Sequence, residues 1–443
     1  MSDYLPTPST PNRFDWLIYS TLFFILTYDV PPVWTSIRFN PNDGSPVQNP
    51  VSYHVFVVLL LITALGYGLA TMGFDITVFG SYIRREPLLW LFVSWITMSA
   101  LWAPDALATF KAASDLVLMS LVAVVLVSRF SVAYIVAFGA AASAVATALH
   151  IYFIVALPNY GQSVGNWKGI TAQKNALGHY ALLACVFFYF CAKFFPRFRA
   201  PNYAFLSINA VLIVGTQSKT SLVSLAALPT MLIVFRVFRA RRTLYGAVAV
   251  AFVAGSITVI AVVGNNIAPI AVALGRDPKL SGRTQLWGAT IDLIRRQPIF
   301  GYGFEGTFNN WFSPGRYVWQ KIGFQLPNAH NAAIQAAADL GLVGAALLIL
   351  LVVRVIVRSA RVLRYLPGSL GMFPLVLAGE TMLFGITEAG IINRNFDFLL
   401  FCIMVLEATT GRRDSLKAPS GDRPPMVALP QPKFSTSLPG AQS

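Results

Sequence analysis

Charged residues are scarce in this chain: of its 443 residues only 12% are Asp, Glu, Lys or Arg, while 56% are hydrophobic. Globular chains average about 25% charged residues. Because so little polar surface cannot coat a soluble body of this length, the composition excludes an ordinary water-soluble protein. It predicts that lipid is the solvent for most of the chain.

Cysteine and histidine are equally sparse, with three and four copies. The cysteines all lie in apolar runs, which predicts small core or lipid-facing residues and no disulfide framework. No His or Cys cluster has the spacing of a metal site, so neither a metal nor a cofactor is expected. The cysteines are Cys185, Cys191 and Cys402.

Nucleotide-handling motifs are missing as well. The absence of GxxxxGK[ST] excludes a Walker-type ATPase, and no strand pattern is present to carry a dinucleotide-binding glycine loop. No Asp-x-Asp pair is available to hold a metal and a nucleotide sugar, so a transferase would not draw on a cytoplasmic nucleotide sugar. The net charge of +15 is dispersed between apolar segments. It therefore indicates membrane topology and not nucleic-acid binding.

Long apolar runs are abundant instead, and about twelve segments approach the length of a membrane span. They predict an all-α, polytopic membrane helical bundle over residues 1–410. Residues 202–236 are alternatively one re-entrant hairpin. The segments are 14–30, 54–73, 88–103, 112–128, 132–156, 177–193, 202–216, 220–236, 244–263, 332–353, 368–387 and 396–409.

Basic residues in short loops mark the cytoplasmic side of such a bundle. The clusters at 236–242 and 354–364 lie there only if both termini are cytoplasmic. The same arrangement predicts one large periplasmic loop, residues 264–331, between the ninth and tenth spans. The tail at 411–443 turns to Pro, Ser, Gly and Lys and is expected to be disordered. No cleavage site follows the first apolar run, so it is expected to remain.

The strongest local signal is PNAHN at 327–331, at the outer end of a long apolar helix. His330 there is a natural general base near neutral pH. Asn331 is placed to cap the helix, whose exposed N–H groups favour an anionic ligand. The alternative is a helix-start histidine that anchors the loop by a hydrogen bond, and the motif alone favours neither.

A second signal contains Arg283, Trp287 and Tyr302. An arginine just outside the membrane can fork onto a phosphate. The run at 285–294 predicts a short amphipathic helix. For Arg295 and Arg296, contact with lipid head groups is the favoured interpretation; for Arg283 it competes with a phosphate contact.

Three lysines lie at predicted outer helix starts. Lys168 and Lys174 flank a turn, Asn175 precedes an apolar helix, and Lys219 stands among hydroxyl residues at 216–221. Each lysine can meet an anion, and Lys219 also suits a sugar. Interfacial anchoring or snorkelling is the alternative for all three.

Acidic residues inside apolar segments are costly and are therefore functional candidates. Asp115, Glu380 and Glu388 are such residues. Glu380 is expected to pair with an arginine or to belong to a proton path. The remaining histidines, which are expected at helix ends or in packing, are His54, His150 and His179.

Together these motifs resemble the O-antigen ligase and polymerase superfamily, and most of all its Wzy-type exopolysaccharide polymerases. The pieces that carry the resemblance lie at 169–178, 282–287, 298–303 and 330–344. They occur in order on one predicted membrane side. The resemblance covers roughly residues 160–395.

The resemblance implies a metal-independent, inverting glycosyltransferase in the bacterial inner membrane. Family members take a glycan from undecaprenyl diphosphate at the periplasmic face. The residue that matches His330 is thought to activate the acceptor hydroxyl, and those that match Lys168 and Arg283 to hold the diphosphate. The family more often has arginine at the position of Lys168. A lysine there puts the bidentate phosphate contact in doubt, with Lys174 as a substitute.

Three functions remain open. A polymerase joins lipid-linked repeat units, a ligase moves the glycan to a lipid acceptor, and a transporter of lipid-linked glycan is a different class that twelve spans and Glu380 would suit. The polar candidates concentrate outside the membrane and not at its midplane, which favours transfer. Polymerase is the preferred interpretation. Its expected partners are the undecaprenyl-diphosphate-linked oligosaccharide, membrane lipid, a flippase and a chain-length regulator.

Overall fold

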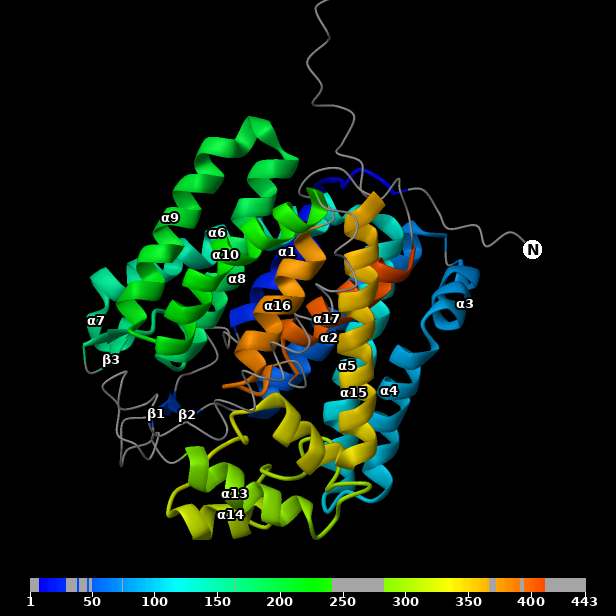
Figure 1. Cartoon of the computed structure of the whole chain (residues 1–443), viewed down its shortest axis with the longest axis vertical. Coiled ribbons are helices and arrows are strands. Elements are labelled where there is room, and N and C mark those ends of the chain that lie inside the picture. The colour runs from blue at the N-terminus through cyan, green and yellow to red at the C-terminus, as the bar shows by residue number, and fades with distance from the viewer. Residues whose placement is uncertain are drawn as a thin grey trace, which may run out of the picture.

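The computed structural model describes residues 8–28, 38–39, 46–47, 50–73, 75–163, 165–240, 283–365, 372–390 and 394–410 (Figure 1). This part of the chain is almost entirely helical. Two antiparallel pairs of two-residue strands complete it, β1 (Arg38–Phe39) with β2 (Pro46–Val47) and β3 (Gln162–Ser163) with β4 (Asn166–Trp167).

The helices follow the apolar segments of the sequence. They are α1 (Arg13–Tyr28), α2 (Pro50–Thr71), α3 (Ile76–Arg85), α4 (Pro87–Met98), α5 (Ala106–Arg129), α6 (Val132–Ala156), α7 (Pro158–Gly161), α8 (Lys174–Phe194), α9 (Arg199–Thr216), α10 (Lys219–Ala240), α13 (Arg283–Ile294), α14 (Gly315–Ile322), α15 (Ala332–Tyr365), α16 (Phe373–Gly385) and α17 (Phe396–Thr410), with 3-10 turns at Ser99–Leu101 and Pro196–Phe198.

Eleven of the twelve predicted segments coincide with helices, and the twelfth, 244–263, lies outside the described residues. The region 202–236 forms two helices, α9 and α10. By length and composition, six of the described helices can cross a membrane: α2, α5, α6, α8, α10 and α15. The loop at 264–331 is described from residue 283, and the tail at 411–443 is outside the described residues.

The outward faces of the bundle are apolar. Leu59 on α2, Val211 on α9 and Leu350 on α15 each expose more than half of their surface. A helix with apolar residues on both its inner and outer faces belongs in a hydrocarbon environment, where its backbone groups are satisfied internally. The bundle is therefore built for the membrane.

The core of the bundle surrounds α8. Of the residues in the apolar stretch of this helix, 89% are buried. This helix packs against α6, α9, α10 and α16. Because α8 is central, residues at its first turn are held rigidly between neighbouring helices. Gly178 lies there against Ser218 and Ser221 of the α10 start, where any larger residue would overlap Ser221. The first turns of α8 and α10 are thus in contact.

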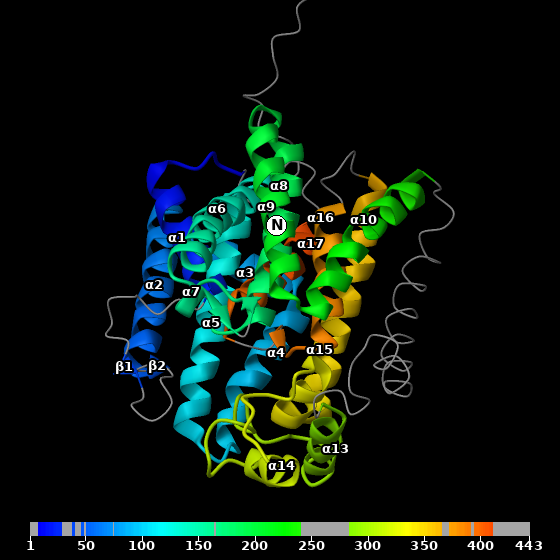
Figure 2. The same cartoon turned by 90° about the vertical axis from the view of Figure 1, so that its left-hand side faces the viewer.

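A layer made of α13, α14 and their connections covers one end of the bundle, and the C-terminal end of α15 lies at the opposite end (Figures 1 and 2). The layer has its own small core of Leu286, Leu293, Phe308 and Trp319, with neighbours around it. It is fastened to the bundle by hydrogen bonds, among them one from Trp102 Nε1 to the carbonyl of Phe300 at 3.1 Å.

A kink in α15 lets residues 298–302 of the layer pack against this helix. Gly341 has φ 69° and ψ −176°, which breaks the helical pattern. The carbonyls released by the kink find other donors: Trp95 Nε1 binds Leu340 at 3.0 Å, and the amide of Tyr302 binds Ala338 at 3.0 Å. Because the polar groups are satisfied in this way, the kink persists inside an apolar helix.

The end of the bundle away from the layer carries paired arginines. Arg354 and Arg358 of α15 both bind Glu86, a fully buried carboxylate between α3 and α4. Arg129 at the end of α5 binds Asp15 at 2.8 Å. These basic residues lie on the side that the sequence assigns to the cytoplasm.

Candidate active site

His330 stands immediately before α15 in a constrained backbone conformation. Its φ of 48° is left-handed, and its amide donates to Asn328 Oδ1 at 2.9 Å. Asn331 caps the helix as expected: its Oδ1 accepts from the amide of Ile334 at 3.0 Å. The amide of the same side chain donates to the carbonyl of Ile386. Hydrogen bonds of Asn328 and Asn331 therefore hold the backbone on either side of His330.

Glu388, just after α16, gathers three of the predicted site residues. Its carboxylate accepts from Nδ1 of His330 at 2.7 Å, from the guanidinium of Arg283 at 3.3 Å and from the amide of Asn175 at 3.4 Å. Arg283 also donates to the carbonyl of Thr387 at 2.9 Å. The starts of α8, α13 and α15 thus meet at the end of α16.

This arrangement selects one tautomer of the neutral imidazole. An ionised carboxylate only accepts hydrogen bonds, so Nδ1 of His330 carries the hydrogen toward Glu388. Nε2 is then left unprotonated and able to accept a proton. The side chains of His330, Glu388 and Arg283 are 15%, 13% and 18% exposed, so the cluster is shielded but reachable.

Further hydrogen bonds hold the segment before His330. Trp287 Nε1 donates to the carbonyl of Ala329 at 2.9 Å, and Gln335 accepts from the Ala329 amide at 2.7 Å. Tyr302, by contrast, lies in the small core of the layer, and its hydroxyl donates to Leu293 at 3.2 Å. Of the two predicted aromatic supports, Trp287 therefore acts on the histidine segment and Tyr302 on the layer.

The predicted lysines occupy neighbouring helix starts. Lys174 opens α8 beside Asn175, and Lys219 opens α10. Lys168 lies in the preceding turn, where its amide binds Gly161 at 2.9 Å. Within the described residues, Lys168 and Lys174 make no hydrogen bond or ion pair with His330 or Glu388. The structure thus joins His330, Arg283 and Asn175 through Glu388, and it places Asn331 at the start of α15 beside His330.

Comparisons with known proteins found two matches. Residues 204–349 match the Wzy_C family, described as O-antigen ligase. The chain is also 30% identical over 205 residues to the exopolysaccharide production protein ExoQ of Rhizobium meliloti (strain 1021), and the match covers 42% of this chain and 45% of that protein.

Both matches are to proteins of the O-antigen ligase and polymerase type that the sequence motifs resemble. The resemblance found in the sequence is thereby confirmed. The matched ligase region includes Lys219, Arg283 and His330, whereas Lys168 and Glu388 lie outside it. The chain spans less than half the length of the curated relative it matches.

Glu388 is the residue whose role the sequence did not reveal. In the sequence it is only an acid at the end of an apolar segment. The spacing of residues along the chain does not predict which side chain such an acid contacts. The structure supplies the partner, because 58 residues separate Glu388 from His330 and the fold alone brings them together.

A second polar cluster lies between α8, α16 and α17. His179 of α8 binds Asp397 of α17 at 2.9 Å and lies 3.3 Å from Glu380 of α16. Glu380 therefore meets an imidazole and not the expected arginine. Because Asn175 and His179 are one helical turn apart on α8, the cluster fixes that face of α8 against α16 and α17.

Asp115, the third marked acid, belongs to another contact between layer and bundle. It lies 3.2 Å from His54 and 3.5 Å from Arg394, which also binds Glu305 of the layer at 2.9 Å. Burial lowers the pKa of Arg394, but Glu305 and Asp115 outweigh burial and raise the pKa overall. In the described part of the chain, no group of three or more His, Cys, Asp or Glu side chains is arranged to hold a metal ion.

Proposed function

We propose that this protein is a polysaccharide polymerase that joins undecaprenyl-diphosphate-linked glycan repeat units at the periplasmic face of the inner membrane. The observation that carries the proposal is the cluster of His330, Glu388 and Arg283 at one end of a membrane bundle. An oriented imidazole beside a fixed guanidinium suits a reaction in which a hydroxyl loses a proton and a diphosphate leaves. The match to the Wzy_C family supports a glycan transferase of this general kind.

His330 is the general base of the proposed reaction. Its Nε2 takes the proton from the acceptor hydroxyl, whose oxygen forms the new bond to the anomeric carbon of the donor. The bond from that carbon to the diphosphate breaks, and undecaprenyl diphosphate leaves with the electron pair. Attack opposite the leaving group inverts the anomeric centre. Glu388 holds the imidazole and stabilises its protonated form. No metal or cofactor enters this scheme.

The surrounding cations have the charge needed for the leaving group. Arg283 is bound to Glu388 in the cluster, Lys174 and Lys219 open α8 and α10, and Lys168 lies in the turn before α8. The N-termini of α8 and α10 add partial positive charge. Fixed cations stabilise a developing diphosphate charge more in the transition state than in the ground state. We assign these four residues to the diphosphate.

The proposal includes a topology. About twelve spans, both termini in the cytoplasm and a periplasmic loop at 264–331 place His330 outside. The basic residues Arg129, Arg354 and Arg358, which lie away from the α13–α14 layer, agree with the positive-inside rule. Residues 1–410 form the transferase domain, and 411–443 form a cytoplasmic tail. A flippase would supply the donor, and a chain-length regulator would set product size.

Transfer to a lipid acceptor is the second candidate, because the matching family is described as O-antigen ligase. A gene deletion distinguishes the two. Loss of polymer with single repeat units on the carrier is expected for a polymerase, whereas full-length chains accumulating on the carrier would show a ligase.

Complementation tests the catalytic assignment in the same strain. A His330→Ala variant should reach the membrane at normal abundance and restore no polymer, because the acceptor hydroxyl has lost its base. Normal polymer from that variant would remove His330 from the mechanism. The native chain is the positive control.

A further inference from the structure

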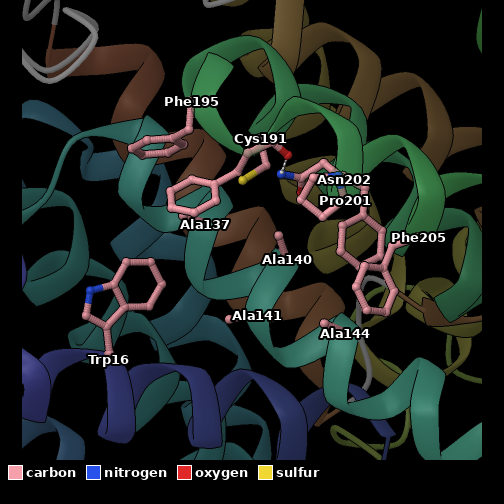
Figure 3. A pocket seen from close by; sticks show the side chains of 12 residues that line it. Trp16, Ala137, Ala140, Ala141, Ala144, Cys191, Phe195, Pro201, Asn202 and Phe205 are labelled. Atoms are coloured by element: carbon pink, nitrogen blue, oxygen red, sulfur yellow. Dashed lines mark hydrogen bonds between the residues drawn. The ribbon is translucent and has the colours of Figure 1, made fainter. Parts of the chain in front are cut away.

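An apolar cavity opens between α1, α6, α8 and α9 (Figure 3), and none of its lining residues belongs to the His330 cluster. Its volume is about 340 Å³, which is within the range of ligand sites. It is lined by Trp16, Ala137, Ala140, Ala141, Ala144, Phe188, Cys191, Phe195, Phe198, Pro201, Asn202 and Phe205.

The cavity walls are almost entirely apolar, which suits an alkyl chain. Ala137, Ala140, Ala141 and Ala144 make one smooth wall of small side chains on α6. The rings of Phe195 and Phe205 also line the cavity (Figure 3). Asn202 is the polar exception, and its amide already donates to the carbonyl of Phe198 at 2.7 Å. A ligand that needs hydrogen bonds would lose them here, whereas a hydrocarbon chain would not.

The turn between α8 and α9 forms one end of the cavity through Phe195 and Phe198, and it is strongly basic. Lys193, Arg197 and Arg199 lie in or beside this turn. The ammonium of Lys193 and the guanidinium of Arg199 both approach the ring of Tyr203, at 5.9 Å and 5.6 Å. Within the described residues no carboxylate pairs with these three cations. Their charge is therefore available to an anionic group.

The cavity is poorly placed for the tail of a donor bound at His330. Asn175 and Cys191 lie 16 residues apart on α8, which is about 24 Å along the helix and roughly 160° around it. A polyprenyl chain that starts beside Asn175 would have to pass around the buried central helix. The cavity also lies at the end of α8 where the cytoplasmic leaflet would be in the proposed topology.

We propose that this cavity is a binding site for an anionic phospholipid, with one acyl chain between α6 and α9 and the phosphate at the basic α8–α9 turn. Anionic lipids are concentrated in the cytoplasmic leaflet and attract basic segments there. The site is separate from the proposed glycan chemistry, and its choice of leaflet rests on the topology given with the proposed function.

Lipid-dependent thermal stability tests the site. The purified full-length protein in detergent is titrated with phosphatidylglycerol or with phosphatidylcholine of the same chains, and the melting temperature is followed. We expect phosphatidylglycerol to raise the melting temperature at about tenfold lower concentration than phosphatidylcholine, because the basic turn meets only the former.

Two variants separate the parts of the site. Ala144→Phe fills the cavity, and Arg197→Gln with Arg199→Gln removes charge from the turn; each should abolish the preference for phosphatidylglycerol. The controls are Ala148→Phe, one turn further along α6 and exposed, and Arg84→Gln, an exposed arginine of α3. Both controls should respond as the native protein does.

Three results would overturn the proposal. They are equal responses to the two lipids in the native protein, an unchanged preference in Ala144→Phe, and loss of the preference in the controls. If Ala144→Phe does not fold, native mass spectrometry of the double arginine variant decides: retained phosphatidylglycerol at native occupancy contradicts the site.

Discussion

At the scale of single residues, the pair of His330 and Glu388 makes the sharpest prediction. A Glu388→Gln substitution removes the charge that orients the imidazole and stabilises its protonated form. We expect kcat to fall by about 10² to 10⁴, while KM for the lipid-linked donor changes little. Steady-state rates with a diphosphate-linked donor measure both quantities.

Asp292 provides the matched acid-to-amide control. It lies on α13 with its carboxylate bound to Lys321 at 2.7 Å, and that hydrogen bond lowers the pKa of Asp292. Exposed ion pairs of this kind contribute little to stability. Asp292→Asn should keep native kinetics; a native kcat in Glu388→Gln would show that Glu388 has no part in the reaction.

Residue types and their spacing were enough to name much of the cluster. His330, Arg283, Asn175 and Asn331 were singled out at predicted helix starts, and the structure brings them to one end of α16. Glu388 stood out only as an acid in an apolar segment, because contacts between distant segments leave no local pattern. The same limit applies to His179, which was expected in packing and lies between two carboxylates.

At the scale of the elements, the kink at Gly341 decides how the layer meets the bundle. Its φ and ψ belong to a region that only glycine adopts readily, and a Cβ would overlap the carbonyl of Ile299. Gly341→Ala should lower stability by about 2 kcal/mol or more. A lower melting temperature of the purified protein is the measurement.

Gly288, in the middle of α13, is the matched glycine. Nothing lies within 4 Å of a Cβ built there. Gly288→Ala should therefore leave the melting temperature unchanged or raise it, since alanine is favoured over glycine inside a helix by about 1 kcal/mol. If both alanine variants behave alike, the kink does not constrain the layer.

Apolar runs located the helices well, because burial in protein and contact with lipid favour the same residue types. They did not reveal the kink, since Gly341 lies within a mostly apolar segment and its conformation is set by the backbone of 298–302 packed against it. The short helix at 285–294 was expected and appears as α13. The strands β3 and β4 are two residues each, too short to show an alternating pattern in the sequence.

At the scale of the whole molecule, the proposed topology predicts which end of the bundle meets the periplasm. Arg295 at the layer end is 75% exposed, and Arg84 at the other end is exposed as well. In intact cells a membrane-impermeant maleimide should label Arg295→Cys and leave Arg84→Cys unlabelled. The native cysteines are buried, so background labelling should be low.

The reverse labelling pattern would invert the bundle and place His330 in the cytoplasm. Lysed cells provide the control, because both engineered cysteines should then react. Orientation came from the distribution of basic residues in the sequence, and the twelve-span count depends on the segment 244–263, which lies outside the described residues.

The central claim is that His330, held by Glu388, drives transfer of a diphosphate-linked glycan. Purified native protein and His330→Ala are each incubated with a defined undecaprenyl-diphosphate oligosaccharide, and product masses are recorded. The native protein should yield lipid-linked chains at multiples of the repeat unit together with released undecaprenyl diphosphate, and the variant should yield neither. Equal ladders from the two proteins would contradict the account.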